Sequence, residues 1–87
     1  MLETGYKLID VRTDEEYEYG RIPGALLIPL FDLKQRKAEL DVQARYIIYC
    51  HAGSRSSVAA LRLTQAGFDV QTLEGGLSAW PFEIEES

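Results

Sequence analysis

This chain of 87 residues is 46% apolar and carries a formal net charge of −5 at pH 7. Its length and apolar content are typical of one small folded domain and argue against a disordered chain. The negative charge argues against a nucleic-acid-binding surface, and no apolar run reaches the roughly 20 residues of a membrane span.

The cellular compartment is also indicated by the sequence. The residues from Met1 to Gly5 lack the basic and apolar regions of a secretion signal. Cys50 is the only cysteine, which excludes an internal disulfide and is typical of a reducing compartment. We therefore expect a cytoplasmic protein.

Strands and helices are predicted to alternate from the start of the chain. The first elements are a strand over 7–11, a short helix capped by Thr13 or Asp14 and ending at Gly20, a strand over 25–28 stopped by Pro29, and an amphipathic helix over 30–40. The acidic residues of the first helix, from Asp14 to Glu18, are interpreted as a solvent-facing surface.

The alternation continues in the second half. The predicted elements are a strand over 45–49, a helix from Ser57 to about Ala66 capped by Gly67, a strand over 69–73, a turn at Gly75 and Gly76, and a short helix over 77–80 stopped by Pro81. Trp80 and Phe82 are expected to cover the core. This order favours an α/β fold with three α/β/α layers around a small, mainly parallel sheet. We expect one domain over 1–82 and an acidic tail over 83–87.

Cys50 occupies a position that favours reactivity. It follows the strand over 45–49, and ligands of parallel sheets bind at the carboxyl ends of the strands. A short loop and a helix N-terminus follow, where backbone N–H groups and the helix dipole favour a thiolate, the reactive form of cysteine. Gly53 is expected to curl this loop by adopting a positive φ. The alternative is an inert core cysteine.

Several motifs resemble those of the rhodanese-like, or thiosulfate sulfurtransferase, domain family. They are Leu8-Ile9-Asp10-Val11-Arg12, Glu16-Tyr17 with Gly20-Arg21-Ile22-Pro23-Gly24-Ala25, Cys50-His51-Ala52-Gly53-Ser54-Arg55-Ser56, Gly67-Phe68, and Leu73-Glu74-Gly75-Gly76 with Trp80. The resemblance implies that the Cys50 thiolate accepts a sulfane sulfur from a donor such as thiosulfate and becomes a persulfide. Because there is no second cysteine, an external thiol or cyanide must then remove the sulfur.

The resemblance also implies roles for individual residues. Cys50 and Arg55 would be catalytic, with Arg55 holding an oxyanion of the donor. The substrate-binding residues would be the rest of the loop, namely His51, Ala52, Gly53, Ser54 and Ser56. Independently of the resemblance, Asp10 and Arg12 lie at the end of a predicted strand, at the same edge of the sheet as Cys50, and are expected to border the pocket or alternatively to form an ion pair that anchors a loop. Cys50 and His51 are too few for a metal site, and no cofactor is expected.

Some positions depart from the family pattern. Arg21 replaces a common histidine, and Leu27 replaces a common asparagine. His51 stands where many members carry arginine, which is expected to weaken anion attraction and alter substrate preference. Only seven residues precede Leu8, so the family's usual first strand and helix are expected to be missing. An uncovered edge would favour a homodimer or a fused partner domain.

Two other functions remain open. Four residues separate Cys50 from Arg55, whereas tyrosine phosphatases and the related cell-cycle phosphatases have five. The shorter loop suits one sulfur atom better than a phosphate group, and Tyr49 stands where tyrosine phosphatases have histidine. The stronger alternative is a rhodanese-fold module with little turnover that binds a partner or senses redox state.

Overall fold

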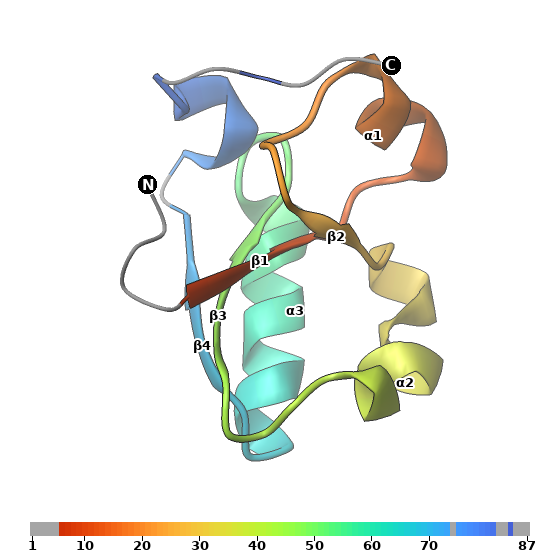
Figure 1. Ribbon diagram of the computed structural model, residues 1–87, viewed down its shortest axis with the longest axis vertical. Coiled ribbons are helices and arrows are strands. Elements are labelled where there is room, and N and C mark those ends of the chain that lie inside the picture. The colour runs from red at the N-terminus through yellow and green to blue at the C-terminus, as the bar shows by residue number, and fades with distance from the viewer. Residues whose placement is uncertain (1–5, 74, 82–83, 85–87) are drawn as a thin grey trace.

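The computed structural model describes residues 6–73, 75–81 and 84 (Figure 1). Its elements in chain order are β1 (Tyr6–Asp10), α1 (Asp14–Tyr19), β2 (Leu26–Leu27), the 3-10 helix η1 (Leu30–Asp32), α2 (Leu33–Arg36), the 3-10 helix η2 (Lys37–Glu39), β3 (Arg45–Tyr49), α3 (Ser54–Gln65), β4 (Asp69–Thr72) and the 3-10 helix η3 (Gly76–Ala79). No helix in these ranges is long and apolar enough to span a bilayer.

The four described strands form one parallel sheet in the order β2-β1-β3-β4. Ile9 of β1 lies opposite Ile48 of β3 and Leu26 of β2. The chain therefore builds the sheet outward from β1 in both directions, first to β2 and then to β3 and β4. Such a reversal of strand order opens a crevice at the carboxyl ends of the two central strands, where ligands of open α/β sheets bind.

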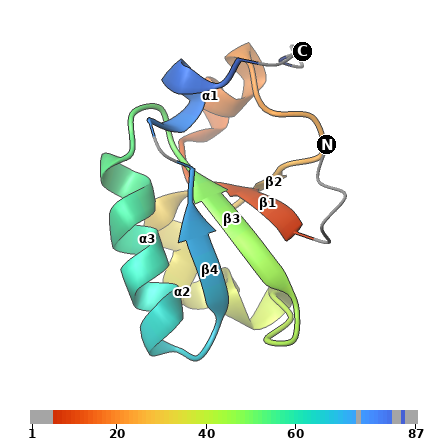
Figure 2. The same ribbon diagram turned by 90° about the vertical axis from the view of Figure 1, so that its left-hand side faces the viewer.

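Figure 2 shows α2 and α3 together on one face of this sheet, and α1 and the blue η3 near the upper end of the strands. Successive strand side chains point to opposite faces, so Ile48 and Cys50 pack in the cluster that includes Leu33 of α2 and Leu63 of α3. Tyr49 packs on the other face, in a cluster that Tyr17 of α1, Leu77 of η3 and Trp80, the C-cap of η3, contact. The predicted three-layer α/β/α fold is confirmed, and the described sheet is wholly parallel.

Two helix boundaries differ from the prediction. The segment over 30–40 contains η1, the four-residue α2 and η2 instead of one helix. Between Leu33 and Leu40 it offers only Ala38 as an apolar residue, too little to hold a continuous helical face against the core. α3 begins at Ser54, three residues before the predicted start, because Gly53 forms its N-cap with a φ of 111°.

The remaining boundaries agree with the sequence to within one or two residues. α1 ends at Tyr19, and Thr13 caps it in a complete capping box with Glu16. Trp80 packs against the core as expected. Phe82 and the predicted acidic tail, apart from Ile84, lie outside the described residues.

Candidate active site

Cys50 lies at the carboxyl end of β3, beside the end of β1. The backbone N–H of Val11, the residue after β1, donates to the carbonyl of Tyr49 over 3.0 Å, so the two central strands stay joined up to the site. Cys50 is 1% exposed, and the next residues turn directly into α3. The cysteine therefore lies in the crevice where the strand order reverses.

The Cys50 sulfur is surrounded by hydrogen-bonding groups from the start of α3. The backbone N–H of Gly53 donates to Sγ over 3.0 Å and that of Ser56 over 3.4 Å, and the Ser56 hydroxyl oxygen lies 3.6 Å from Sγ. Burial raises the pKa of the thiol, but hydrogen bonds from the Ser56 hydroxyl and the backbone N–H groups of Ser56, Gly53 and Arg55 outweigh it. The net pKa is lowered, which favours the thiolate.

The Ser56 hydroxyl can serve either protonation state of Cys50. It lies 3.1 Å from the carbonyl oxygen of Gly53, to which it donates when the thiol S–H donates to the serine oxygen. When the thiol is ionised, the hydroxyl proton can turn toward Sγ. The Gly53 carbonyl is then still satisfied by the N–H of Ser57 at 3.1 Å and the Ser57 hydroxyl at 2.8 Å. Ionisation therefore leaves no buried acceptor unpaired.

Arg55 lies in the first turn of α3, and its guanidinium group binds Glu16 of α1. Nη1 lies 2.7 Å from Oε1 and Nη2 lies 3.0 Å from Oε2. This pairing, helped by the Thr13 cap and opposed by partial burial, lowers the pKa of Glu16 to about 2. Glu16, whose side chain is 35% exposed, is therefore partly solvent-facing as interpreted, but it also pairs with Arg55, which the interpretation missed. Its spacing from Thr13, a capping-box signature, is the signal that sets it apart from its acidic neighbours.

The start of η3 forms hydrogen bonds with the backbone of Cys50 and His51. The N–H of Leu77 donates to the carbonyl of Cys50 over 2.8 Å, and the N–H of Ser78 donates to that of His51 over 3.0 Å. Gly76 adopts a φ of 61°, and a Cβ atom there would overlap both carbonyl oxygens. Sequence reasoning predicted only a turn at Gly76 and missed this contact with the loop that follows Cys50.

The other predicted loop residues line or flank an open hollow of about 440 Å³. Ala52, Gly53 and Ser56 line it, together with residues at the end of β4. The side chain of His51 is exposed, and Ser54 is exposed at the start of α3. This hollow opens beside the loop whose N–H groups surround Sγ.

Asp10 and Arg12 form a buried ion pair at the end of β1. Arg12 Nη2 lies 2.7 Å from Asp10 Oδ2, and the Arg12 N–H donates to Oδ1 over 2.9 Å. Nη2 also donates to the carbonyl of Gly20, the C-cap of α1. The pair thus anchors the segment that carries Glu16. Arg12 also lines a small hollow together with Arg55.

The described residues contain no group of three His, Cys, Asp or Glu side chains placed to hold a metal ion. The site thus offers the Cys50 sulfur, the hydrogen-bond donors that surround it, and the cationic side chain of Arg55 in the first turn of α3.

Comparison with known proteins identifies the family. The model of the rhodanese-like domain matches residues 1–82. The chain therefore belongs to the rhodanese-like domain family.

Similar proteins in sequence and in structure agree with this assignment. A protein from Allochromatium vinosum named "Sulfurtransferase" is 39% identical over 74 residues, covering 84% of this chain and 69% of the relative. "Putative sulfurtransferase YtwF" of Bacillus subtilis is 40% identical over 78 residues, covering 90% and 76%. The crystal structure of a rhodanese-like domain protein from Staphylococcus aureus has a TM-score of 0.88 at 36% identity and covers 94% of this chain and 81% of that one.

Proposed function

We propose that this protein is a sulfurtransferase of the rhodanese type that carries the transferred sulfur as a persulfide on Cys50. The family and the relatives named as sulfurtransferases support the class of reaction. The observation that carries the assignment to Cys50 is the set of N–H donors from Gly53 and Ser56 that point at its sulfur. These donors stabilise negative charge on sulfur, which both halves of the reaction require.

In the first half, the Cys50 thiolate attacks the outer sulfur of thiosulfate. A new sulfur–sulfur bond forms, the sulfur–sulfur bond of thiosulfate breaks, and sulfite leaves with the electron pair. The product is a Cys50 persulfide anion, and no proton is transferred. The loop N–H groups are placed to stabilise that anion, since they already surround Sγ.

In the second half, an acceptor nucleophile attacks the outer sulfur of the persulfide. The bond to Cys50 breaks and its electron pair returns to Sγ as a thiolate. A thiol acceptor becomes a persulfide, and cyanide becomes thiocyanate. The lowered pKa of Cys50 makes its thiolate a better leaving group, so the same hydrogen bonds serve both steps.

Arg55 is proposed to act mainly through its charge. Its guanidinium group is occupied by the Glu16 carboxylate. The hydrogen bonds to Glu16 raise the pKa of Arg55 against the effect of burial, and the negative charges of Glu16 and of the Cys50 thiolate add to this rise. The loop amides are then the direct anion ligands, with Arg55 adding a positive potential at the same helical turn. The single reactive thiol suits the reducing cytoplasm, where we place the protein.

Intact-mass measurement after incubation with thiosulfate tests the proposal. The wild-type protein is expected to gain one sulfur atom, and cyanide is expected to remove it and release thiocyanate. Cys50→Ser is expected to gain nothing. A wild-type protein that stays unmodified, while a known sulfurtransferase is loaded under the same conditions, would refute the proposed function.

A further inference from the structure

The backbone and the side chain of Arg55 have different partners. Its backbone N–H is one of the donors around the Cys50 sulfur. Its guanidinium group instead binds Glu16, and the two terminal nitrogens each donate to one carboxylate oxygen, over 2.7 and 3.0 Å. Arginine binds carboxylates and other oxyanions through this same pair of donors. Glu16 therefore occupies the groups with which Arg55 would bind an anionic substrate.

Glu16 is also held in place by its own helix. Its Oε1 accepts hydrogen bonds from the backbone N–H of Thr13 over 3.0 Å and from the Thr13 hydroxyl over 3.2 Å, as part of the capping box of α1. The hydrogen bonds from Arg55 and Thr13 outweigh partial burial and lower the pKa of Glu16 to about 2. At neutral pH the carboxylate is thus a fixed negative charge with which an anionic substrate competes for Arg55.

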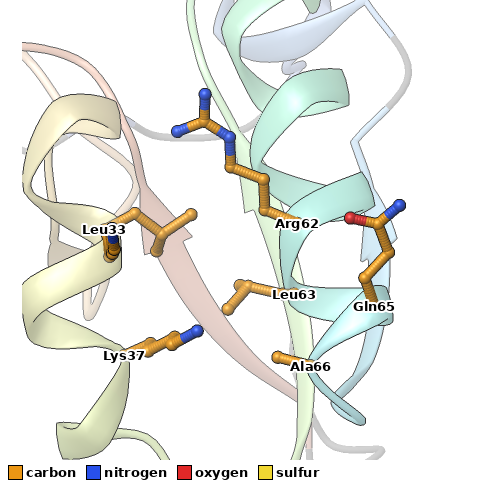
Figure 3. A pocket seen from close by; sticks show the side chains of 7 residues that line it. Leu33, Lys37, Arg62, Leu63, Gln65 and Ala66 are labelled. Atoms are coloured by element: carbon orange, nitrogen blue, oxygen red, sulfur yellow. The ribbon is translucent and has the colours of Figure 1, made fainter.

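The other arginines near the site do not replace Arg55. Arg12 is 4% exposed, and its guanidinium group is paired with Asp10. Arg62 follows Arg55 by two helical turns, about 10 Å along the axis. Its side chain extends from α3 toward α2 and lines a groove between these two helices (Figure 3). The described residues that line the hollow beside the loop after Cys50 carry no charged side chain. The attraction of anions to the sulfur therefore depends mainly on Arg55.

We propose that Glu16 is a positioning residue that limits the attraction of anions to Cys50 by holding Arg55. The carboxylate offsets part of the positive potential of the guanidinium group at the sulfur and keeps its donors occupied. The site thereby disfavours a doubly charged donor such as thiosulfate relative to a sulfane sulfur donor with one negative charge or none. That the anion is a sulfur donor rests on the proposed function, but the effect of the pair on anions does not.

Two alkylating reagents that differ by one charge test the proposal without any sulfur donor. In each reaction the Cys50 thiolate displaces iodide, so that a carbon–sulfur bond forms and the carbon–iodine bond breaks. Iodoacetate is an anion and iodoacetamide is neutral, and Cys50 is the only cysteine that either can modify. The ratio of the two rates is measured at low ionic strength, at a pH above the alkylation midpoint of each protein, so that the thiolate fraction cancels.

Glu16→Gln is expected to raise the ratio of the iodoacetate rate to the iodoacetamide rate about two- to threefold, because it frees Arg55 to attract the anion. Added salt should reduce this difference. Glu15→Gln removes the same charge from an exposed neighbour and is expected to keep nearly the wild-type ratio. In an Arg55→Gln background, Glu16→Gln is expected to have no further effect, because the group through which it acts is gone.

Three results would overturn the proposal. They are an unchanged ratio in Glu16→Gln, an equal rise in Glu15→Gln, and a full rise in the Arg55→Gln background. A change in the loop geometry alone would alter the rates of both reagents and leave their ratio as it is in the wild type.

Thiosulfate loading, followed by intact mass, separates this proposal from the proposed function. For a dianion the expected rise in the loading rate of Glu16→Gln is roughly the square of the factor found with iodoacetate. A raised alkylation ratio with no sulfur loaded on either protein would refute the proposed function and support the role of Glu16. Equal loading rates with an unchanged alkylation ratio would overturn the role of Glu16 and support the proposed function.

Discussion

Ser56 is the residue on which the charge state of Cys50 depends most directly. Its backbone N–H and its hydroxyl both face the sulfur, and both lower the pKa of the thiol. The Ser56 side chain is fully buried, so its hydroxyl contact with the sulfur is shielded from solvent. In the proposed reaction the Cys50 thiolate needs this stabilisation twice, once when it attacks the donor and once when it leaves the persulfide.

Ser56→Ala is therefore expected to raise the pKa of Cys50, because it removes the hydroxyl while keeping the backbone N–H. The midpoint of iodoacetamide alkylation should move to higher pH, and the alkylation rate below that midpoint should fall. Ser54→Ala, at an exposed serine one position before Arg55, is the control and should keep the wild-type midpoint. An unchanged midpoint in Ser56→Ala would contradict this account.

The Glu16 and Arg55 pair links α1 to the helix that carries the site. The pKa of Glu16 is lowered to about 2, so its contribution to stability is complete above the ordinary pKa near 4.5 and is lost as the pH falls toward 2. Both side chains are 35% exposed, so solvent screening reduces this contribution to about 1 kcal/mol.

Glu16→Gln isolates this charge, because glutamine also satisfies a capping box. The variant should unfold at a lower temperature than the wild type at pH 7, and the two melting temperatures should converge as the pH approaches 2. Glu15→Gln, which changes an exposed neighbour, should melt nearly as the wild type does at both values. A difference between Glu16→Gln and wild type that does not depend on pH would exclude the ion pair as its cause.

Among the elements, η3 positions the loop that follows Cys50, although none of its side chains contacts the sulfur in the part of the chain that the structure describes. Its N–H groups at Leu77 and Ser78 bind the carbonyls of Cys50 and His51, while the N–H of Gly53, two residues further along the loop, donates to the sulfur. The close approach requires a residue without Cβ at Gly76.

Gly76→Ala is expected to displace the loop, raise the midpoint of Cys50 alkylation and reduce sulfur loading from thiosulfate. Gly24→Ala is the matched control: Gly24 also has a positive φ, of 86°, but a Cβ atom there meets nothing within 4 Å. It should cost about 1 kcal/mol of stability and leave the alkylation profile unchanged. Equal alkylation profiles for the two variants would show that the approach of η3 does not set the loop geometry.

The sequence predicts an element best where its ends are set by neighbouring residues in the chain. α1 was predicted at both ends because Thr13 and Gly20 determine its caps. The start of α3 was missed because Ser54, Arg55 and Ser56 have no apolar periodicity, and only the conformation of Gly53 starts the helix there. The break of the segment over 30–40 depends on how little apolar surface it offers to the core.

For the molecule as a whole, the fold assigns the family but does not by itself select the reaction. The spacing between Cys50 and Arg55 favours the proposed sulfur transfer, since four residues make a small loop whose N–H groups at Gly53 and Ser56 contact the sulfur. A tetrahedral phosphate needs more donors at a greater radius from the sulfur.

We therefore expect the protein to release no phosphate from an aryl phosphate beyond the rate of Cys50→Ser. Thiosulfate, measured in parallel, should load sulfur on the wild-type protein only. Phosphate release that depends on Cys50 would show that the loop accommodates a phosphoryl group and would favour the phosphatase hypothesis.

The sequence by itself determined the strands, the three-layer fold, the position of Cys50 between a strand and a helix N-terminus, and the positive φ of Gly53. These follow from apolar alternation, caps and turn residues, which act between neighbours in the chain. Only the tertiary structure decided that Arg55 faces Glu16, 39 positions away, and that η3 holds the loop at Gly76. Parallel strands join segments distant in sequence, so such contacts depend on the order of the strands in the sheet. The groove between α2 and α3 arises in the same way, from two helices packed on one face.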